Sequence, residues 1–343
     1  MNTPDATRSI GVFDSGVGGL TVLKALQAEM PHERLVYLGD TARLPYGTKS
    51  PASIARYACQ ATALLQQRDI KLLVVACNTA SAVALDALRE QMRPLPVIGV
   101  VEPGATAAVD AKPGGRHLVL ATEATVRLGA YREAILGLDA AAAVDELACE
   151  LLVSLAEEGW NDGAIAEAIV HRYLEELPVA ARHPDSVILG CTHFPLLRET
   201  FRAVFDEGVA IVDSANTTAR AARELIEDLG LGRADSEEGM IESAARLEAA
   251  RHGARFVLLV FQQTIRISSL RSTFGLVHQF VPLDVRLPER QTGMHHLLGD
   301  ASPIRRRRIA ETGTLPYIDS QMLCGAWNVT PGVILDHVLL QSR

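Results

Sequence analysis

The sequence lacks the features of a disulfide-stabilised, zinc-binding or membrane-spanning protein. Its five cysteines are an odd number, widely spaced, with no Cys-x-x-Cys pair, which argues against a disulfide framework and a structural zinc site. No run approaches the roughly 18 apolar residues of a membrane span. The segment before Ser9 also lacks the apolar stretch of a secretory signal. We therefore expect a cytoplasmic protein whose thiols are reduced.

A general excess of positive charge is also absent. The net charge of −8 argues against a protein that binds nucleic acid over its whole surface. The Arg305–Arg308 run is more typical of a solvated segment. His295 and His296 have no further ligand at metal-binding spacing, so we predict no metal. The apolar content of 48% and charged content of 22% indicate an ordinary globular protein of one or two domains.

The stretch that organises the chain is Lys71–Ser81. A buried apolar run ends abruptly at Cys77, and Asn78 and Thr79 follow before a helical period begins. This pattern predicts a parallel strand that leads into a helix. Cys77 is then expected at the carboxyl edge of a sheet, where open α/β sheets bind ligands. The dipole of the following helix favours an anion there, including a thiolate.

A second stretch, Ser186–Leu197, repeats this arrangement. Another β-branched apolar run ends at a cysteine, Cys191, and Thr192 and His193 follow at once. A cysteine at the same point of two βα units predicts two related domains that contribute to one site.

Other strand ends carry polar residues whose interpretation is open from the sequence alone. The strand Ser9–Asp14 leads into Ser15 and a glycine-rich turn that is not a GxGxxG nucleotide motif. The strand Arg116–Ala121 is followed by Thr122 and Thr125. Helix capping explains these side chains as well as ligand binding does.

Three further interpretations come from local pattern. Pro45-Tyr46-Gly47 has the composition of a turn, and a plain surface turn is as good a reading as a binding loop. Cys59 and Cys149 lie in apolar runs and are interpreted as packing residues. Ile241–Arg251 has a pattern compatible with a helix.

Several kinds of chemistry use cysteine. A covalent hydrolase could use Cys191 with His193, but it would leave Cys77 unused. A thiol–disulfide enzyme normally keeps its two cysteines close in sequence. Two equivalent thiols on opposite walls suit the removal of a proton from one face of a carbon and its return to the other face.

Five motifs in order, FDSGVGGLTV, LPYGT, ACNTAS, VVEPGA and GCTHFPLL, resemble those of the glutamate racemases, in the aspartate/glutamate racemase superfamily. The resemblance covers about residues 9–231, and aspartate racemases as a rule lack the first two motifs. It implies an α/β fold of two similar lobes, with mainly parallel sheets flanked by helices and the active site in the cleft between them.

The resemblance also implies roles for individual residues. Cys77 and Cys191 would be the two bases, with Cys77 acting on D-glutamate and Cys191 on L-glutamate. Asp14 and His193 would tune the thiols and also contact the substrate. The other substrate-binding residues would be Ser15, Pro45, Tyr46, Gly47, Asn78, Thr79, Thr122, Thr125, Glu157 and Thr192.

The implied activity is the cofactor-independent interconversion of L- and D-glutamate, with D-glutamate supplied for peptidoglycan and so for cell-wall biogenesis and cell shape. The alternatives are a racemase of another acidic amino acid such as aspartate, and a non-catalytic amino-acid-binding protein. The resemblance leaves a homodimer open.

By the same resemblance, residues 9–97 and about 210–254 would form the first lobe, and residues 98–209 the second. Residues 255–343 extend beyond the family pattern, as an atypical C-terminal extension with 10 arginines and 6 acidic residues. Leu128 stands where the family often has serine.

Overall fold

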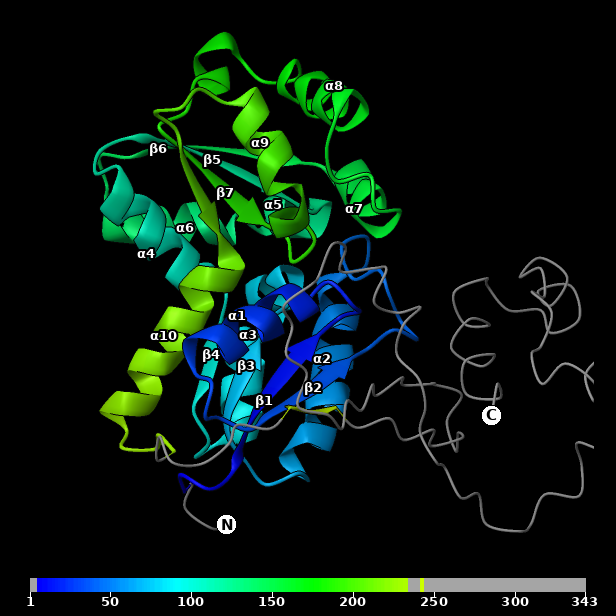
Figure 1. Ribbon diagram of the computed structural model, residues 1–343, viewed down its shortest axis with the longest axis vertical. Coiled ribbons are helices and arrows are strands. Elements are labelled where there is room, and N and C mark those ends of the chain that lie inside the picture. Colours follow the sequence, from blue (N-terminus) through cyan, green and yellow to red (C-terminus); the bar gives the residue numbers. More distant parts are fainter. Residues whose placement is uncertain (1–4, 234–240, 244–343) are drawn as a thin grey trace, which may run out of the picture. The chain divides into compact units, whose positions relative to one another are not determined.

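The computed structural model describes residues 5–233 and 241–243, which contain two parallel sheets. One sheet has the strand order β4-β3-β1-β2-β9 and the other has the order β6-β5-β7-β8. Within the described residues every strand pairing is parallel. This confirms the predicted α/β class of two helix-flanked, mainly parallel sheets (Figure 1). We call each sheet, together with its helices, a lobe.

The first lobe combines the beginning of the described chain with its end. Its elements are β1 (Ser9–Asp14), α1 (Leu20–Glu29), β2 (Leu35–Gly39), α2 (Pro51–Gln66), β3 (Ile70–Val75), α3 (Asn78–Met92), β4 (Val97–Gly99), α10 (Ser214–Asp228) and β9 (Ile241–Ser243).

The second lobe is formed by the intervening segment. Its elements are α4 (Val101–Ala111), β5 (Arg116–Ala121), α5 (Glu123–Leu128), α6 (Ala130–Leu138), β6 (Ala143–Ala148), α7 (Glu150–Glu157), α8 (Ala164–Leu174), the 3₁₀ turn η1 (Val179–Arg182), β7 (Ser186–Gly190), the 3₁₀ turn η2 (Phe194–Leu197), α9 (Arg198–Val204) and β8 (Ala210–Asp213).

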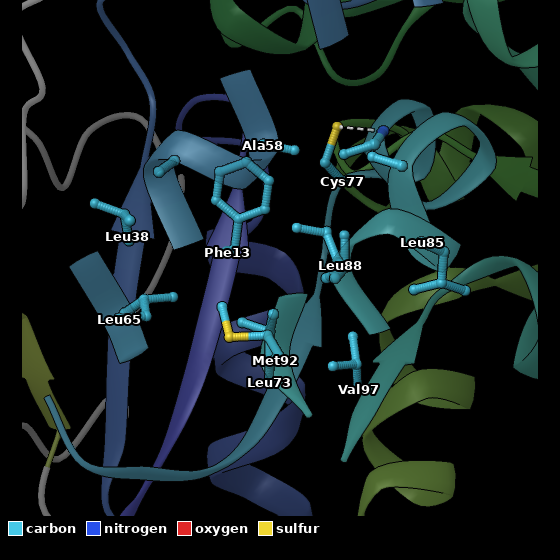
Figure 2. Close-up of a cluster of buried hydrophobic side chains, with 14 of the residues drawn as sticks. Phe13, Leu38, Ala58, Leu65, Leu73, Cys77, Leu85, Leu88, Met92 and Val97 are labelled. Atoms are coloured by element: carbon cyan, nitrogen blue, oxygen red, sulfur yellow. Dashed lines mark hydrogen bonds between the residues drawn. The ribbon is translucent and has the colours of Figure 1, made fainter. Parts of the chain in front are cut away.

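The strands of the first sheet are apolar on both sides because helices cover both faces. Phe13 and Leu38 pack with α2 and α3, in the cluster that Figure 2 shows. Ile10 and Val12 pack instead with α1 and α10. Alternate residues of one strand therefore enter different halves of the core, which explains why the strands read as continuous apolar runs.

The helix starts follow the local capping chemistry. Ser50 caps α2, with its Oγ accepting from the Ser53 backbone N–H at 3.3 Å, and Pro51 occupies the first turn as predicted. At the start of α10, Asp213 accepts from the backbone N–H of Asn216 at 2.8 Å.

The structure moves two lobe boundaries and corrects one element. Residues 98 and 99 belong to β4, which pairs with β3, and residues 210–213 form β8, which pairs with β7. The chain therefore returns to the first lobe at about Ser214 rather than near 210, where α10 packs on α1. The expected helix at Ile241–Arg251 is wrong at its start, because Ile241–Ser243 pair with the edge strand β2.

Several sequence expectations concern residues outside this description. They are the 255–343 extension, His295, His296 and the Arg305–Arg308 run. Among the helices of the described part, none is long and apolar enough to cross a membrane. Cys59 is partly buried against the core cluster of α2 and α3, as expected of a packing residue.

Candidate active site

The two predicted cysteines occupy equivalent places in the two sheets. Cys77 follows β3, whose neighbour β1 ends at Asp14. Cys191 follows β7, whose neighbour β5 is followed by Thr122. Each sheet therefore presents a thiol and a second polar residue at the carboxyl ends of adjacent strands, which is the edge predicted from the sequence.

Cys77 is buried and forms the N-cap of α3. Its Sγ lies 3.2 Å from the Ser15 hydroxyl. The same sulfur accepts from the Ala80 backbone N–H at 3.4 Å, the bond drawn as a dashed line in Figure 2. Burial raises the pKa of the Cys77 thiol to about 12, and the nearby Asp14 carboxylate adds to the rise. The hydrogen bonds of Cys77 with Ser15 and Ala80 oppose this rise in pKa. At neutral pH Cys77 therefore carries its proton.

Cys191 has a different neighbour. Its Sγ lies 3.7 Å from Nδ1 of His193, and Nε2 of the same ring lies 3.2 Å from Oε1 of Glu157. Burial alone would lower the pKa of His193, but the bonds to Cys191 and Glu157 and nearby negative charge raise it to about 10. At neutral pH an imidazolium therefore faces the sulfur of Cys191, and such a cation favours a thiolate.

Asp14 lies at the end of β1, and the glycine-rich turn closes around it. Its Oδ2 accepts from the Gly16 backbone N–H at 2.9 Å. Burial raises the pKa of Asp14, and the Gly19 backbone N–H and the charge on His193 oppose that rise. A Cβ built on Gly19 would lie 2.5 Å from Cβ of Asp14, so the close approach requires glycine there.

Three threonine hydroxyls meet between the lobes. Oγ1 of Thr79, at the start of α3, lies 2.9 Å from Oγ1 of Thr122 and 3.2 Å from Oγ1 of Thr125. The last two lie 3.0 Å apart. All three are buried, so the structure brings together three of the hydroxyls predicted to bind substrate.

The predicted binding loop also reaches the second lobe. The backbone oxygen of Gly47 accepts from the Ala124 N–H at 3.0 Å. The Tyr46 hydroxyl donates instead to Oδ2 of buried Asp40 at 2.6 Å, and Pro45 is exposed. A direct substrate contact of Tyr46 or Pro45 thus stays a prediction.

Other contacts at the site were not anticipated from the sequence. Thr21 of α1 donates to the backbone oxygen of Thr192 at 2.8 Å, and Tyr131 of α6 donates to Oδ1 of Asn78 at 2.7 Å. Asp40, which accepts from Tyr46, directly follows β2. Its position at the end of a strand is the only feature of the sequence that could have drawn attention to Asp40. No sequence pattern predicts the contacts of Thr21 with Thr192 and of Tyr131 with Asn78.

The comparisons with known proteins fit this geometry. A family model described as Asp/Glu/Hydantoin racemase matches residues 20–222. The chain belongs to this family. The glutamate racemase of Geobacter metallireducens is 48% identical over 232 residues, which are 68% of this chain and 85% of that protein. The glutamate racemase of Chlorobium phaeobacteroides is 46% identical over 229 residues, 67% of this chain and 83% of that protein.

Solved structures of the family are similar as well. Thermus thermophilus glutamate racemase in complex with beta-chloro-D-alanine has a TM-score of 0.62 and 42% identity, over 69% of this chain and 87% of that one. Francisella tularensis glutamate racemase in complex with D-glutamate has a TM-score of 0.63 and 34% identity, over 71% of this chain and 90% of that one.

Two further features of this racemase family member are a third buried cysteine and the question of a metal site. Buried Cys149 follows β6, and its Sγ lies 3.6 Å from the Leu147 backbone oxygen. Burial raises the pKa of Cys149 well above its usual range, so it is a neutral thiol, in keeping with a packing role. Within residues 5–233 and 241–243, no group of three His, Cys, Asp or Glu side chains could hold a metal ion.

Proposed function

We propose that this chain is a glutamate racemase that uses Cys77 and Cys191 as its two acid–base groups. The observation that carries the proposal is the pairing of thiols from two equivalent strand ends. They are close enough that negative charge on Cys191 contributes to the raised pKa of Cys77. Similarity to glutamate racemases over about two thirds of the chain supports the substrate.

Racemisation needs the two thiols in different protonation states, one as a thiolate and one as a thiol. The protonated ring of His193 faces Cys191, and Cys77 keeps its proton, so we assign the thiolate role in the L-to-D direction to Cys191. The Cys191 thiolate removes the α-proton of L-glutamate and forms an S–H bond. The Cys77 S–H bond then breaks as its proton adds to the opposite face of the carbanion, which yields D-glutamate.

The reverse reaction uses the same groups in exchanged states. D-Glutamate loses its α-proton to Cys77, and Cys191 delivers a proton to the other face. The Ser15 hydroxyl and the Ala80 backbone N–H lie where they can stabilise a thiolate at Cys77. No other acid–base group is required, so the proposed mechanism is cofactor-independent.

The polar residues around the thiols suit a substrate with two carboxylates. Nδ2 of Asn78 is buried and has no hydrogen-bond partner among the described residues, so it is available to donate. The hydroxyls of Thr79, Thr122 and Thr125 supply further donors. We assign Asp14 and Glu157 to the ammonium side of the substrate. We assign the remaining predicted residues, Ser15, Gly47, Thr192 and His193, to the same binding site.

In a cell, the proposed product D-glutamate would serve peptidoglycan synthesis, which places the enzyme in a bacterial cytoplasm. A homodimer is part of the same proposal. Aspartate is the competing substrate, and a shorter side chain would leave its distal carboxylate out of reach of some donors.

The test is circular dichroism of L-glutamate with the purified full-length chain. We expect the signal to decay to zero as the two enantiomers reach equal amounts, and the same assay with L-aspartate to be much slower. A constant L-glutamate signal would contradict the activity, and faster decay with L-aspartate would contradict the substrate. Repeating the assay after dialysis against a chelator should leave the rate unchanged.

A further inference from the structure

Tyr131 connects the two cysteine-bearing strand ends. Its hydroxyl donates to Oδ1 of Asn78, the residue after Cys77. Its ring packs against Gly190, the residue before Cys191, since a Cβ built on Gly190 would lie 3.2 Å from Cε2 of the tyrosine. One buried side chain of α6 thus contacts both walls of the proposed site.

The ring of Tyr131 is held firmly in this place. A Cβ built on Gly104 of α4 would lie 3.2 Å from Cε1, on the opposite edge from Gly190. The aromatic ring therefore fits between two glycines, Gly104 and Gly190, which have no side chain to occupy that space. Burial also raises the pKa of the Tyr131 hydroxyl far above its usual range, so it remains a neutral donor.

The bond to Tyr131 determines how the Asn78 amide is oriented. An amide has one acceptor end and one donor end, and Oδ1 of Asn78 is taken by the tyrosine hydroxyl. The donor end, Nδ2, is then fixed on the other side, where it is buried without a hydrogen-bond partner among the described residues. A buried amide donor without a partner requires an acceptor, and a substrate carboxylate supplies one.

We propose that Tyr131 is a positioning residue for racemisation: its hydroxyl holds the Asn78 amide with Nδ2 toward the substrate carboxylate. The inference rests on the proposed function, because it assumes an amino-acid substrate beside Cys77. Without the hydroxyl, the amide is free to turn its oxygen toward the carboxylate, which replaces an attraction by a repulsion.

The first test replaces Tyr131 by phenylalanine, which keeps the ring between Gly104 and Gly190. We expect KM for glutamate in the Tyr131→Phe variant to rise roughly 10-fold or more, the size expected for one charge-assisted hydrogen bond. The control is Tyr173→Phe in α8, whose hydroxyl accepts from the Leu151 backbone N–H at 3.1 Å, away from the site. KM of the control should stay within about 2-fold of wild type.

A double-mutant cycle separates positioning from a general loss of structure. If Tyr131 acts through Asn78, the Tyr131→Phe change has little further effect on KM once Asn78→Ala is present. Equal effects of Tyr131→Phe in the two backgrounds would overturn the proposal, as would an unchanged KM in the single variant. Inactive wild-type protein would instead contradict the proposed function itself, so the two failures are distinguishable.

A second variant covers the case in which Tyr131→Phe does not fold. Asn78→Asp keeps an acceptor for the Tyr131 hydroxyl but replaces the amide donor by a carboxylate oxygen. We expect this variant to fold, as judged by its thermal transition, and to bind glutamate at least 10-fold more weakly in calorimetry. Wild-type affinity in Asn78→Asp would overturn the inference, because the donor would then have no role.

Discussion

Glu157 lies on the far side of the His193 ring from Cys191, with Oε1 of the carboxylate 3.2 Å from Nε2. The ring therefore has a carboxylate at one nitrogen and a thiol sulfur at the other, 3.7 Å from Nδ1. This arrangement keeps the imidazole protonated where a thiolate is required, and it makes the two thiols electrostatically unequal.

Replacing Glu157 by glutamine should lower the pKa of His193, because one of the interactions that raise it is lost. As the pH is raised, His193 in this variant then loses its proton at a lower pH than it does in wild type. We expect the alkaline limb of the kcat/KM profile for L-glutamate to move to lower pH. The shift should be modest, since the Glu157 side chain is 45% exposed and solvent screens its charge.

The control for that profile is Glu158→Gln, a neighbouring exposed glutamate at the end of α7. Its alkaline limb should coincide with that of wild type. Coincident profiles for wild type and Glu157→Gln would instead show that Glu157 does not govern the protonation of His193.

Gly18→Ala should damage catalysis without unfolding the protein. A Cβ at this position would lie 2.6 Å from Cε1 of His193 and would also collide with Oγ1 of Thr192. The turn that carries Cys191 must then shift, and a displacement of about 1 Å can cost on the order of 10²-fold in rate. We expect kcat/KM to fall by about that factor.

Gly137→Ala is the matched control, since a Cβ there would meet nothing within 4 Å. Gly137 lies inside α6, so alanine should leave activity unchanged and stabilise the helix by roughly 0.5–1 kcal/mol. Wild-type kcat/KM in Gly18→Ala would contradict the tight contact between the glycine turn and His193.

Because His117 is buried, we expect the protein to lose stability in mild acid. His117 is fully buried in β5, where Nδ1 lies 2.7 Å from the Ser186 hydroxyl. Burial lowers the pKa of His117, while Asp139 and Asp185 oppose that shift. Below the ordinary histidine pKa of about 6.5, the unfolded state binds a proton that the folded state resists, so stability falls with pH.

Urea unfolding at pH 7.5 and pH 5.5 measures this effect. The free energy of unfolding should fall less between pH 7.5 and pH 5.5 in His117→Asn than in wild type. The difference should be at most about 1.4 kcal/mol per pH unit. The exposed His171→Asn in α8 should behave like wild type. An equal loss in His117→Asn and wild type would rule out His117 as the source.

Removal of the C-terminal extension should leave the chemistry intact. The predicted site residues all precede residue 231, and β9 ends at Ser243. We therefore expect a protein truncated after Ala254 to keep its kcat/KM. A folded but inactive protein of this length would show that the extension takes part in catalysis.

A protein truncated earlier, after Gly230, should be less stable than the protein truncated after Ala254. Fully buried Lys71 lies 2.6 Å from Glu33 and donates to the backbone oxygen of Leu231 at 2.7 Å. Glu33 and the Ala6 backbone oxygen still hold the ammonium, but one of its buried N–H donors loses its acceptor, which should cost roughly 1–3 kcal/mol. Thermal unfolding of the two truncated proteins measures the difference.

The sheets and the two cysteine positions could be predicted because each depends on a local pattern. Strands buried on both faces read as apolar runs, and Cys77 and Cys191 end two such runs. The family resemblance, rather than periodicity, assigned the two thiols their expected chemical roles. The resemblance implied Glu157 only as a substrate-binding residue. Its pairing with His193 was not anticipated, since no local pattern joins two residues on different elements.

The contacts between lobes could not be predicted for a physical reason. Thr21 with Thr192 and Tyr131 with Asn78 join residues far apart in the chain, and hydrophobic periodicity does not identify a tertiary partner. β9 was missed because the pairing of a short edge strand depends on the free edge of β2. Local sequence pattern does not show where that edge lies.

The central claim is that Cys77 and Cys191 act on opposite faces of the α-carbon. The most direct test is racemisation of L-glutamate in heavy water, stopped early and analysed by mass spectrometry after separation of the enantiomers. The D-glutamate formed should carry one solvent deuterium, while the remaining L-glutamate stays largely unlabelled. Unlabelled D-glutamate would mean that one base returns the original proton, and it would contradict the two-thiol account.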